Sequence, residues 1–439
     1  MRKSLRLTAA AGVFVILAAA CGSDKKEEVK GGGETTASAA ETTTTAGGGN
    51  DRGNIDGVLT IGALLPQSGD LSAILKSLDT PVQMAIDEIN AAGGVNGKDV
   101  IVKRADDGTS ADVAGTSLDT LLNSDKVDTI IGPASSGTAL GILDKVKTAG
   151  VVQCSGSNTS AELSTADDGG YYFRTAPADK LQGPALAQVV LADGKKNPAI
   201  VTRNDSYGTG FGDALEDAIV NGGAKVAINA AYDPAATDFK ADVSKVKAAN
   251  PDAVILIGFN DDGGKVVKEM IAQGVGPDKI QIYTADGMQG SSFFKGVDEA
   301  NPAVVKGIKG TAPAAAPAGV TSPFTEAFTA KKIDPIFSSY YYDCTILTAL
   351  AAQAAGSDDP AKIKDKMLEV SQGGTKCNTY AKCLNALEAG EDIDYDGASG
   401  PVDLTDVGEP SNGVYDVWEY DDKGAPGNIK GVEQIKIEG

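Results

Sequence analysis

The sequence contains no histidine and a single tryptophan among its 439 residues. Without histidine there can be no Ser-His-Asp triad, no histidine general base and no histidine ligand for zinc. Enzymes can use Asp, Lys or Tyr instead, so this absence disfavours catalysis without excluding it. We therefore expect a protein that is not an enzyme and that needs no metal or other cofactor.

Positive charge is also scarce. The chain has 39 Lys and Arg against 60 Asp and Glu, a net charge of −21, and it has no basic block beyond its first six residues. Nucleic-acid binding needs a cluster of Lys and Arg, so this balance argues against a nucleic-acid partner. The acidic excess itself reports mainly on solubility.

Long apolar runs are missing after the N-terminus, which reads MRKSLRLTAAAGVFVILAAAC. Basic residues precede a short apolar stretch, and small residues lead up to Cys21. The stretch is too short to span a membrane, so it predicts a signal peptide over residues 1–20. The small residues before Cys21 resemble a bacterial lipobox, although Leu17 stands one position further from the cysteine than is common. We expect Cys21 to carry a lipid; the alternative is an ordinary signal with a chance cysteine.

Residues 21–57 have almost no large apolar side chains. Such a composition cannot offset the entropy cost of ordering, so we expect a disordered tether. The protein is then exported and attached only by its lipid to the outer face of the cytoplasmic membrane, at the cell surface or in the periplasm.

Four cysteines remain beyond Cys21, in a compartment that permits disulfides. Several pairings are possible. The stretch CNTYAKC closes a short loop, which favours Cys377–Cys383 and therefore Cys154–Cys344.

From Val58 onward, short β-branched runs alternate with amphipathic stretches. VLTIGALL, DVIVKRADD, VDTIIGP and VVQC predict strands, with apolar residues at helical spacing between them. Thr80-Pro81 predicts the start of the first helix, with proline in the first helical position. The order βαβαβαβ predicts an α/β fold with a parallel sheet covered on both faces.

After YYFRTAP the alternation starts again. AIVTRND, KVAINAAYD, DAVILIGF and KIQIYTADG predict the strands of a second α/β unit. A third block, from about Lys306, holds a long helix around SSYYYDCTILTALAAQAAG and late strands near GVYDVWEY. Two such units in succession predict two lobes with a ligand cleft between them.

Hydroxyl-rich loops follow the predicted strands, most clearly GPASSG and CSGSNTSAEL. Ligands of doubly wound sheets bind at these strand ends. No strand is followed by a Gly-Lys-Ser/Thr phosphate loop, the first lacks G-x-G-x-x-G, and a G-x-S-x-G nucleophile would need a histidine. Binding remains, since hydroxyls and free amides at a helix N-terminus suit a carboxylate. In isolation Ser135 and Ser136 would be better interpreted as a helix cap; the second loop at the neighbouring strand end favours a ligand site.

Taken together, these stretches resemble the leucine/isoleucine/valine-binding protein family, the type I solute-binding lipoproteins of ABC importers. The resemblance runs from Val58 to about Tyr420, and its most specific piece is AIDEINAAGGVNGKDVIVKRADDGTSADVA. GPASSG, SNTSAELS, FRTAP, SYGTGFG and YYYDC follow in the family's order. The resemblance implies the type I periplasmic-binding-protein fold, with two doubly wound parallel-sheet lobes joined by three hinge crossings.

The resemblance also implies how the chain divides. The first lobe would hold residues 58–176 and 311–400, including Cys154 and Cys344. The second lobe would hold residues 177–310 and the C-terminal strands in 401–439. The crossings would lie near residues 174–177, 309–313 and 400–402.

A set of ligand-binding residues follows from the resemblance as well. They are Ser135, Ser136, Ser157, Thr159, Tyr207, Phe259 and Asp286. In the first lobe, Ser136 would bind the ligand's carboxylate through its hydroxyl, with Ser135 beside it. Ser157 would offer its backbone carbonyl to the ligand's ammonium group, and Thr159 both its hydroxyl and its amide.

In the second lobe, Asp286 would be the acidic partner of the ammonium group, and Tyr207 and Phe259 would face the cleft. Each has a simpler interpretation. Asp286 could be an exposed turn carboxylate, Phe259 could pack in the core, and Tyr207 could simply start a helix. The loop GDLSAILKS lacks the tryptophan that helps form the side-chain pocket in well-known members, so this pocket is expected to differ in size.

The sequence thus predicts a monomeric lipoprotein that captures an amino acid, branched-chain-like or a related small polar molecule, and delivers it to ABC permease subunits. A sensory receptor with the same fold is the main alternative. A surface hydrolase is disfavoured by the missing histidine.

Overall fold

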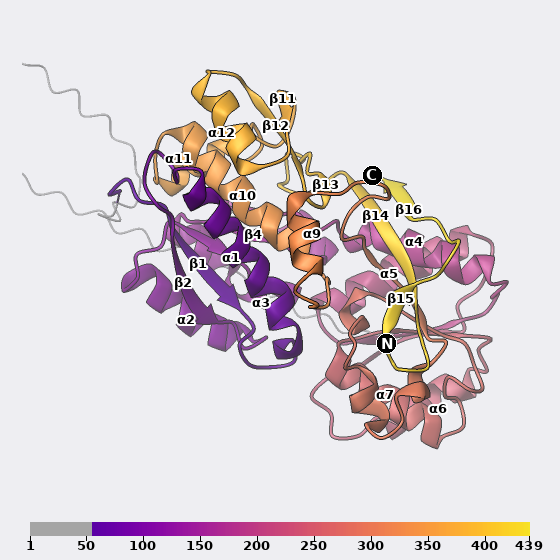
Figure 1. The fold of residues 1–439 in the computed structure, drawn as a ribbon. Helices are drawn as coiled ribbons and strands as arrows, with labels where there is room; N and C mark the ends of the chain where they lie inside the picture. Colours follow the sequence, from indigo (N-terminus) through magenta and orange to yellow (C-terminus); the bar gives the residue numbers. More distant parts are fainter. Residues whose placement is uncertain (1–54) are drawn as a thin grey trace, which may run out of the picture. The chain divides into compact units, whose positions relative to one another are not determined.

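The computed structural model describes residues 55–439, and it confirms the predicted α/β fold. Two largely parallel sheets form the centres of two lobes, and helices pack on both (Figure 1). The predicted signal peptide, the lipidated Cys21 and nearly all of the predicted tether lie outside the described residues. Within residues 55–439, no helix is long and apolar enough to cross a membrane.

The first lobe is built on a five-stranded parallel sheet. Its strands are β1 (Thr60–Leu65), β2 (Ile101–Asp106), β3 (Thr129–Ile131), β4 (Val152–Ser155) and β5 (Tyr172–Arg174). The spatial order is β2-β1-β3-β4-β5. Because this order reverses between β1 and β3, the loops after these two strands border the crevice where such sheets bind ligands.

The helices of the first lobe come from two distant parts of the chain. The earlier ones are η1 (Ser72–Ile74), α1 (Leu75–Ala91), α2 (Ala111–Asn123), α3 (Ser136–Ala149) and η2 (Ala161–Ser164). The later ones are α9 (Pro323–Thr329), α10 (Ser338–Ala355), α11 (Pro360–Lys366) and α12 (Tyr380–Glu388). A small sheet adjoins them, made of β11 (Thr375–Cys377), β12 (Ile393–Gly397) and β13 (Gly400–Pro401).

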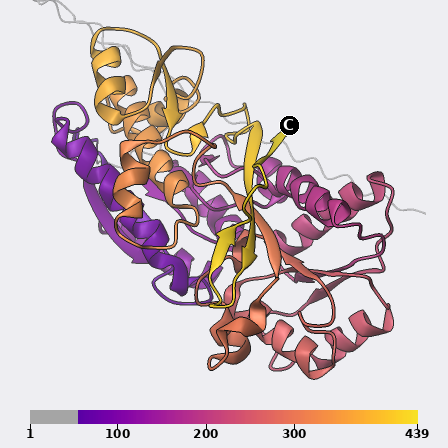
Figure 2. The same cartoon turned by 45° about the vertical axis from the view of Figure 1, so that its right-hand side comes forward.

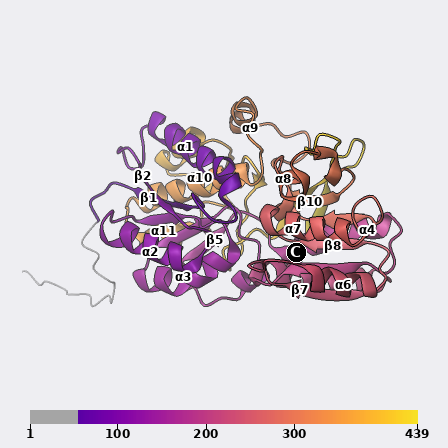
Figure 3. The ribbon, with the colours of Figure 1, turned by 90° about the horizontal axis from the view of Figure 1, so that it is seen from below.

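Two helical layers sandwich the first sheet. α10 packs along α1 and against β3 and β4, as the orange and indigo ribbons of Figure 2 show. α2 and α3 pack together on the opposite face (Figure 3). Their apolar stripes, including Leu118 and Ile142, are buried against Leu64 and Ile130 of the sheet. This two-sided cover explains why β1 is buried along its whole length.

The first helix begins earlier than predicted. α1 starts at Leu75, so Pro81 lies inside the helix and not at its first position, which makes the prediction of a start at Thr80-Pro81 wrong. The apolar spacing explains the difference, because Leu71, Ile74 and Leu78 extend the stripe that continues at Val82. The earlier start brings this segment close to the end of β1.

The second lobe is built on an eight-stranded sheet. Its strands are β6 (Ala199–Arg203), β7 (Ile228–Tyr232), β8 (Val254–Ile257), β9 (Ile282–Thr284), β10 (Lys309–Pro313), β14 (Asn412–Tyr420), β15 (Pro426–Asn428) and β16 (Ile435–Glu438). Its helices are α4 (Asp179–Ala192), α5 (Ser206–Asn221), α6 (Lys240–Ala248), α7 (Asn260–Ala272), η3 (Asp286–Met288), α8 (Phe294–Asp298) and η4 (Pro302–Val305). β6 to β10 are parallel, and β14 closes the series as an antiparallel partner of β10.

The chain passes between the two lobes three times. The first passage joins β5 to α4, and the second follows β10, whose residues up to Pro313 pair in the second sheet. Before the third passage, a turn over residues 404–409 hydrogen-bonds to the first lobe: the Arg174 N–H donates to the Gly408 carbonyl, and the Leu404 N–H to Ser371 Oγ. The chain then enters the second sheet at β14.

Both disulfides of the favoured pairing are present. Cys154–Cys344 joins β4 to α10, and Cys377–Cys383 joins β11 to α12. Both therefore crosslink the first lobe.

Candidate functional site

The GPASSG loop ends at the N-terminus of α3, a helix of 14 residues. Ser135 is its N-cap residue, but the Ser135 side chain makes no capping hydrogen bond. The first N–H groups of a helix have no intrahelical partner, so this end of α3 presents free donors. The interpretation of Ser135 as a simple side-chain cap is therefore not supported.

Asp107 fixes the position of this loop. Its carboxylate accepts the Ala134 N–H at 2.9 Å and the Thr109 N–H at 2.7 Å. Burial raises the pKa of Asp107 to about 6 against these two hydrogen bonds. Asp107, directly after β2, thus supports the loop after β3.

Ser136 connects the two hydroxyl-rich loops. Its buried Oγ accepts the N–H groups of Thr159 and Ser160, both at 3.2 Å. A serine hydroxyl has two lone pairs and one hydrogen, so both lone pairs are occupied. The hydrogen remains available as a donor, and a carboxylate oxygen would be a strong acceptor for it.

The second loop uses most of its own polar groups internally. The Ser157 hydroxyl donates to the Ala134 carbonyl at 2.8 Å and lies 3.0 Å from the Tyr341 hydroxyl. The Thr159 carbonyl accepts the Asp179 N–H at 2.7 Å. The Thr159 N–H donates to Ser136 Oγ, and the Thr159 side chain hydrogen-bonds Asp179. The predicted ligand contacts of Thr159 stay predictions.

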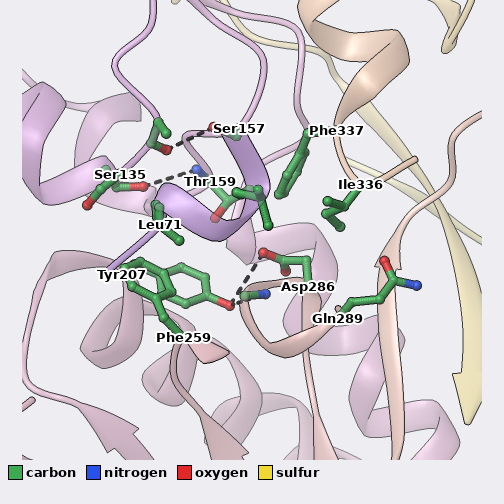
Figure 4. Close-up of a pocket in the computed structure, with 14 residues that line it drawn as sticks. Leu71, Ser135, Ser157, Thr159, Tyr207, Phe259, Asp286, Gln289, Ile336 and Phe337 are labelled. Atoms are coloured by element: carbon green, nitrogen blue, oxygen red, sulfur yellow. Dashed lines mark hydrogen bonds between the residues drawn. The ribbon is translucent and has the colours of Figure 1, made fainter. Parts of the chain in front are cut away.

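Asp286 lies on the second lobe, at the start of η3 directly after β9. It is 5% exposed, so it is not an exposed turn carboxylate. Oδ1 accepts a hydrogen bond from Gln182 Nε2 at 2.7 Å. Oδ2 lies 3.5 Å from the Tyr207 hydroxyl, as Figure 4 shows. Burial raises the pKa of Asp286 to about 6, although these hydrogen bonds oppose the shift. No cation partner is placed on it by the described residues, so it is a buried acceptor suited to a ligand cation.

An aromatic wall continues from Asp286. Tyr207, in the first turn of α5, stacks on Phe259, the N-cap residue of α7, with ring centroids 5.6 Å apart. The Arg203 guanidinium lies 3.6 Å from the centre of the Phe259 ring. Arg203 forms ion pairs with Asp205 and Asp262, and these pairs hold its guanidinium against the Phe259 ring.

These groups from both lobes line one small cavity. All of the predicted ligand-binding residues line it: Ser135, Ser136, Ser157, Thr159, Tyr207, Phe259 and Asp286. Figure 4 shows that the Tyr207 hydroxyl points toward Asp286, whereas Ser157 and Thr159 approach from the first lobe. The structure thus brings together side chains that are far apart in the sequence.

The apolar part of the lining was missed by sequence reasoning. Leu71 and Ile74 come from the segment before α1, and Ile336 and Phe337 from the segment before α10. Leu71 and Ile74 belong to the GDLSAILKS loop, where the missing tryptophan had already marked a side-chain pocket. Ile336 and Phe337 carried no local signal, because only the fold brings them to the cavity.

The cavity combines three kinds of surface. The first lobe supplies neutral hydrogen-bond donors, the second supplies a buried carboxylate, and aliphatic and aromatic side chains fill the remainder. Among residues 55–439, no group of three or more Cys, Asp and Glu side chains is placed to hold a metal ion. Such an arrangement can hold a small molecule that carries an anionic end, a cationic end and an apolar body.

Comparisons with known proteins agree with this geometry. A model of the periplasmic binding protein family matches residues 58–424. The chemotactic signal transduction system substrate-binding protein BasB of Halobacterium salinarum is 26% identical over 379 residues, 83% of this chain and 88% of that protein. Leu/Ile/Val-binding protein homolog 3 of Brucella melitensis is 26% identical over 387 residues, 85% and 94% of the two chains.

A solved structure shows the same fold. The branched-chain amino acid transporter substrate-binding protein LivJ of Streptococcus pneumoniae, in complex with isoleucine, superposes with a TM-score of 0.69. The alignment covers 86% of this chain and 99% of that one at 23% identity. This chain therefore belongs to the periplasmic binding protein family, as a solute-binding protein of the leucine/isoleucine/valine-binding type with the type I fold.

Proposed function

We propose that the protein captures an amino acid in the cavity between its lobes and delivers it to the permease of an ABC importer. One observation carries the proposal: neutral donors of the first lobe face the buried carboxylate of Asp286 across a single cavity. A zwitterion needs donors for its carboxylate and a counter-charge for its ammonium group once both leave water.

Each end of the zwitterion has a specific set of partners in this proposal. The Ser136 hydroxyl and the free amides of α3 bind the carboxylate, with Ser135 beside them. Asp286 pairs with the ammonium group, which also contacts the Thr159 hydroxyl and the Ser157 carbonyl. Tyr207 and Phe259 cover the site from the second lobe.

The apolar lining supports an aliphatic side chain on the ligand. Leu71, Ile74, Ile336 and Phe337 offer no charge, so a branched-chain amino acid would bury its side chain among them. The isoleucine complex of the pneumococcal LivJ, which has the same fold, supports this class of ligand.

The proposed function also includes the setting. We infer that the two lobes close on the ligand by bending at the three crossings. The protein would act as a monomer, outside the cytoplasmic membrane and held by the lipid on Cys21. The family supports an extracytoplasmic location, and the anchor rests on the sequence alone.

Thermal unfolding with a panel of small molecules tests the proposal. A ligand at about 100 times its Kd adds roughly 2.7 kcal/mol of stability, so a binding amino acid raises the Tm clearly. We expect a shift with valine, leucine or isoleucine, and a much smaller one with 3-methylbutanoate, which lacks the ammonium group, or isobutylamine, which lacks the carboxylate. A panel in which 3-methylbutanoate shifts the Tm as much as valine would contradict the role of Asp286.

A ligand-sensing receptor that acts on a signalling partner is the second candidate. Its support is the similarity to BasB, which belongs to a chemotactic signal transduction system. Capture experiments with the ligand-loaded protein separate the two: the importer requires association with a permease, and the receptor requires association with a transmembrane signalling protein.

A further inference from the structure

Arg174, the last residue of β5, is fully buried and lies outside the cavity lining. Its guanidinium nevertheless reaches the second ligand loop. One terminal nitrogen donates to the carbonyls of Asn158, at 3.2 Å, and Ser160, at 2.8 Å. The other donates to Ser164 Oγ at 2.9 Å. Arg174 therefore binds the loop on both sides of Thr159, the cavity residue.

These contacts fix the peptide planes that flank Thr159. The Asn158 carbonyl, held by Arg174, shares a plane with the Thr159 N–H, which donates to Ser136 Oγ. In the next plane, the Thr159 carbonyl accepts the Asp179 N–H and the Ser160 N–H donates to Ser136. Each of the two peptide planes is therefore held by hydrogen bonds at both its carbonyl and its N–H group. Because these planes meet at the Thr159 Cα atom, they fix the direction in which the Thr159 side chain points.

The same contacts hold Ser136. Its two lone pairs accept hydrogen bonds from the two planes, so the direction in which its hydroxyl hydrogen can point depends on where those planes lie. A shift of the loop that carries Thr159 would therefore move both the Ser136 hydroxyl, the proposed donor to the ligand's carboxylate, and Thr159, the proposed contact of its ammonium group.

Glu409 supplies the counter-charge that a buried arginine requires. It is 2% exposed, its Oε2 accepts Arg174 Nε at 3.1 Å and the Ser164 hydroxyl at 2.8 Å, and Lys180 Nζ lies 2.6 Å from Oε1. Burial alone would raise the pKa of Glu409, but Arg174, Lys180 and Ser164 outweigh it and hold this pKa below its ordinary value. The carboxylate is thus ionised and keeps the guanidinium in place.

We propose that Arg174 is a positioning residue for ligand binding: with Glu409, it holds Thr159 and Ser136 in the orientation that the two charged ends of the ligand require. The proposal rests on the proposed function, because it assumes that the ligand meets Thr159 and Ser136. Arg174 itself does not touch the ligand.

Arg174→Lys tests this role. Lysine keeps the positive charge beside Glu409, but it lacks the planar fork that reaches both carbonyls. We expect the affinity for the amino acid that the native protein binds to fall roughly tenfold or more, and the amides of residues 155–164 to exchange hydrogen faster. Arg104→Lys is the matched control, since Arg104 forms a half-exposed pair with Asp79 in the same lobe, and it should change neither quantity.

Glu409→Gln is the second variant, in case Arg174→Lys does not fold. It keeps the shape of the side chain and removes its charge, so we expect a smaller loss of affinity and faster exchange in the same segment. A merely structural role would lower the Tm and leave the affinity unchanged well below the Tm. Unchanged affinity and exchange in folded variants would overturn the proposal.

The exchange measurement separates this proposal from the proposed function. If the native protein binds no amino acid, the proposed function fails. Faster exchange of residues 155–164 in Arg174→Lys would then still support the positioning of the loop, and unchanged exchange would refute it.

Discussion

The two walls of the cavity use opposite means to hold a ligand. The wall from the first lobe consists of hydroxyls and a helix N-terminus, all of them neutral, and its polar groups are largely bonded to one another. The wall from the second lobe contains Asp286, a carboxylate that burial disfavours. The polar groups of the first wall therefore mostly have partners without a ligand, apart from the Ser136 hydroxyl hydrogen and the first amides of α3. Asp286 in the second wall is buried without a cationic partner among the described residues, so a cation would stabilise it.

The lobes differ in their covalent structure as well. Both disulfides crosslink the first lobe, and among residues 55–439 the second lobe has none. The first lobe thus has two disulfides and neutral donors at the cavity, whereas the second lobe has no disulfide among the described residues and a buried carboxylate. Each prediction below concerns one of these two lobes.

The largest expected effect concerns the crosslinks. Cys154→Ala/Cys344→Ala opens a loop with a sequence separation of 190 residues and should lower the free energy of unfolding by about 5 kcal/mol. Cys377→Ala/Cys383→Ala, with a separation of 6 residues, should lower it by about 2 kcal/mol. Urea unfolding followed by circular dichroism measures both, and equal losses would contradict the dependence on loop length.

The next effect concerns the buried charge. Asp286→Asn should weaken amino-acid binding roughly 100-fold, because the ammonium group loses its counter-charge. Without ligand, the variant should be at least as stable as the native protein at pH 7, because the substitution removes a carboxylate whose ionised form burial destabilises. Calorimetric titration and urea unfolding measure the two quantities. Asp261→Asn, on the exposed pair with Lys265, is the control. A large loss of stability in Asp286→Asn would mean that Asp286 is structural.

The pH dependence follows from the same carboxylate. Its pKa is raised to about 6 in the folded, unliganded protein, so the folded state holds a proton that the unfolded chain has already lost above pH ~4. The contribution of Asp286 to stability is fully present below pH ~4 and is lost as the pH rises through about 6, a change of about 3 kcal/mol.

Ligand binding depends on pH in the opposite sense. The ammonium group requires the ionised carboxylate, so affinity should fall by about tenfold for each pH unit below 6. Asp286→Asn should remove this slope. Asp107 and Asp343, whose pKa values burial also raises to about 6, are unchanged in that variant and serve as an internal reference. A slope that persists in the variant would assign the proton to another group.

The smallest effects separate two neighbouring serines. Ser136→Ala removes the donor to the carboxylate and leaves two buried N–H groups without an acceptor, so we expect roughly tenfold weaker binding and a loss of about 1–3 kcal/mol in stability. Ser135→Ala should change stability little, since its side chain makes no capping bond. Equal effects of the two substitutions would contradict the central place of Ser136.

The sequence predicted the fold well because its signals are local. Buried strands such as β1 read as continuous apolar runs, and the order of the loops matched one family. The site was predicted through that family: Ser136 and Asp286 follow strands at recognisable positions. The start of α1 was misplaced because a proline rule was preferred to the apolar spacing of Leu71 and Ile74.

The remaining features depend on contacts that only the folded chain creates. Gln182 reaches Asp286 from a helix more than a hundred residues away in sequence, and Arg174 meets Glu409 at a separation of 235. Neither pairing has a local pattern. The hydrogen bond from the Thr159 N–H to Ser136 Oγ could not be predicted from the sequence either, because the two residues lie on different loops.

The interleaving of the two lobes has a consequence for biogenesis. The first sheet is covered by α10 only after residue 338 has been made, and β10 receives its antiparallel partner only with Asn412–Tyr420. A chain synthesised from its N-terminus therefore cannot cover the first sheet before Ala355 has been made, or complete the second sheet before Tyr420. Neither lobe can therefore fold completely from the first half of the chain alone.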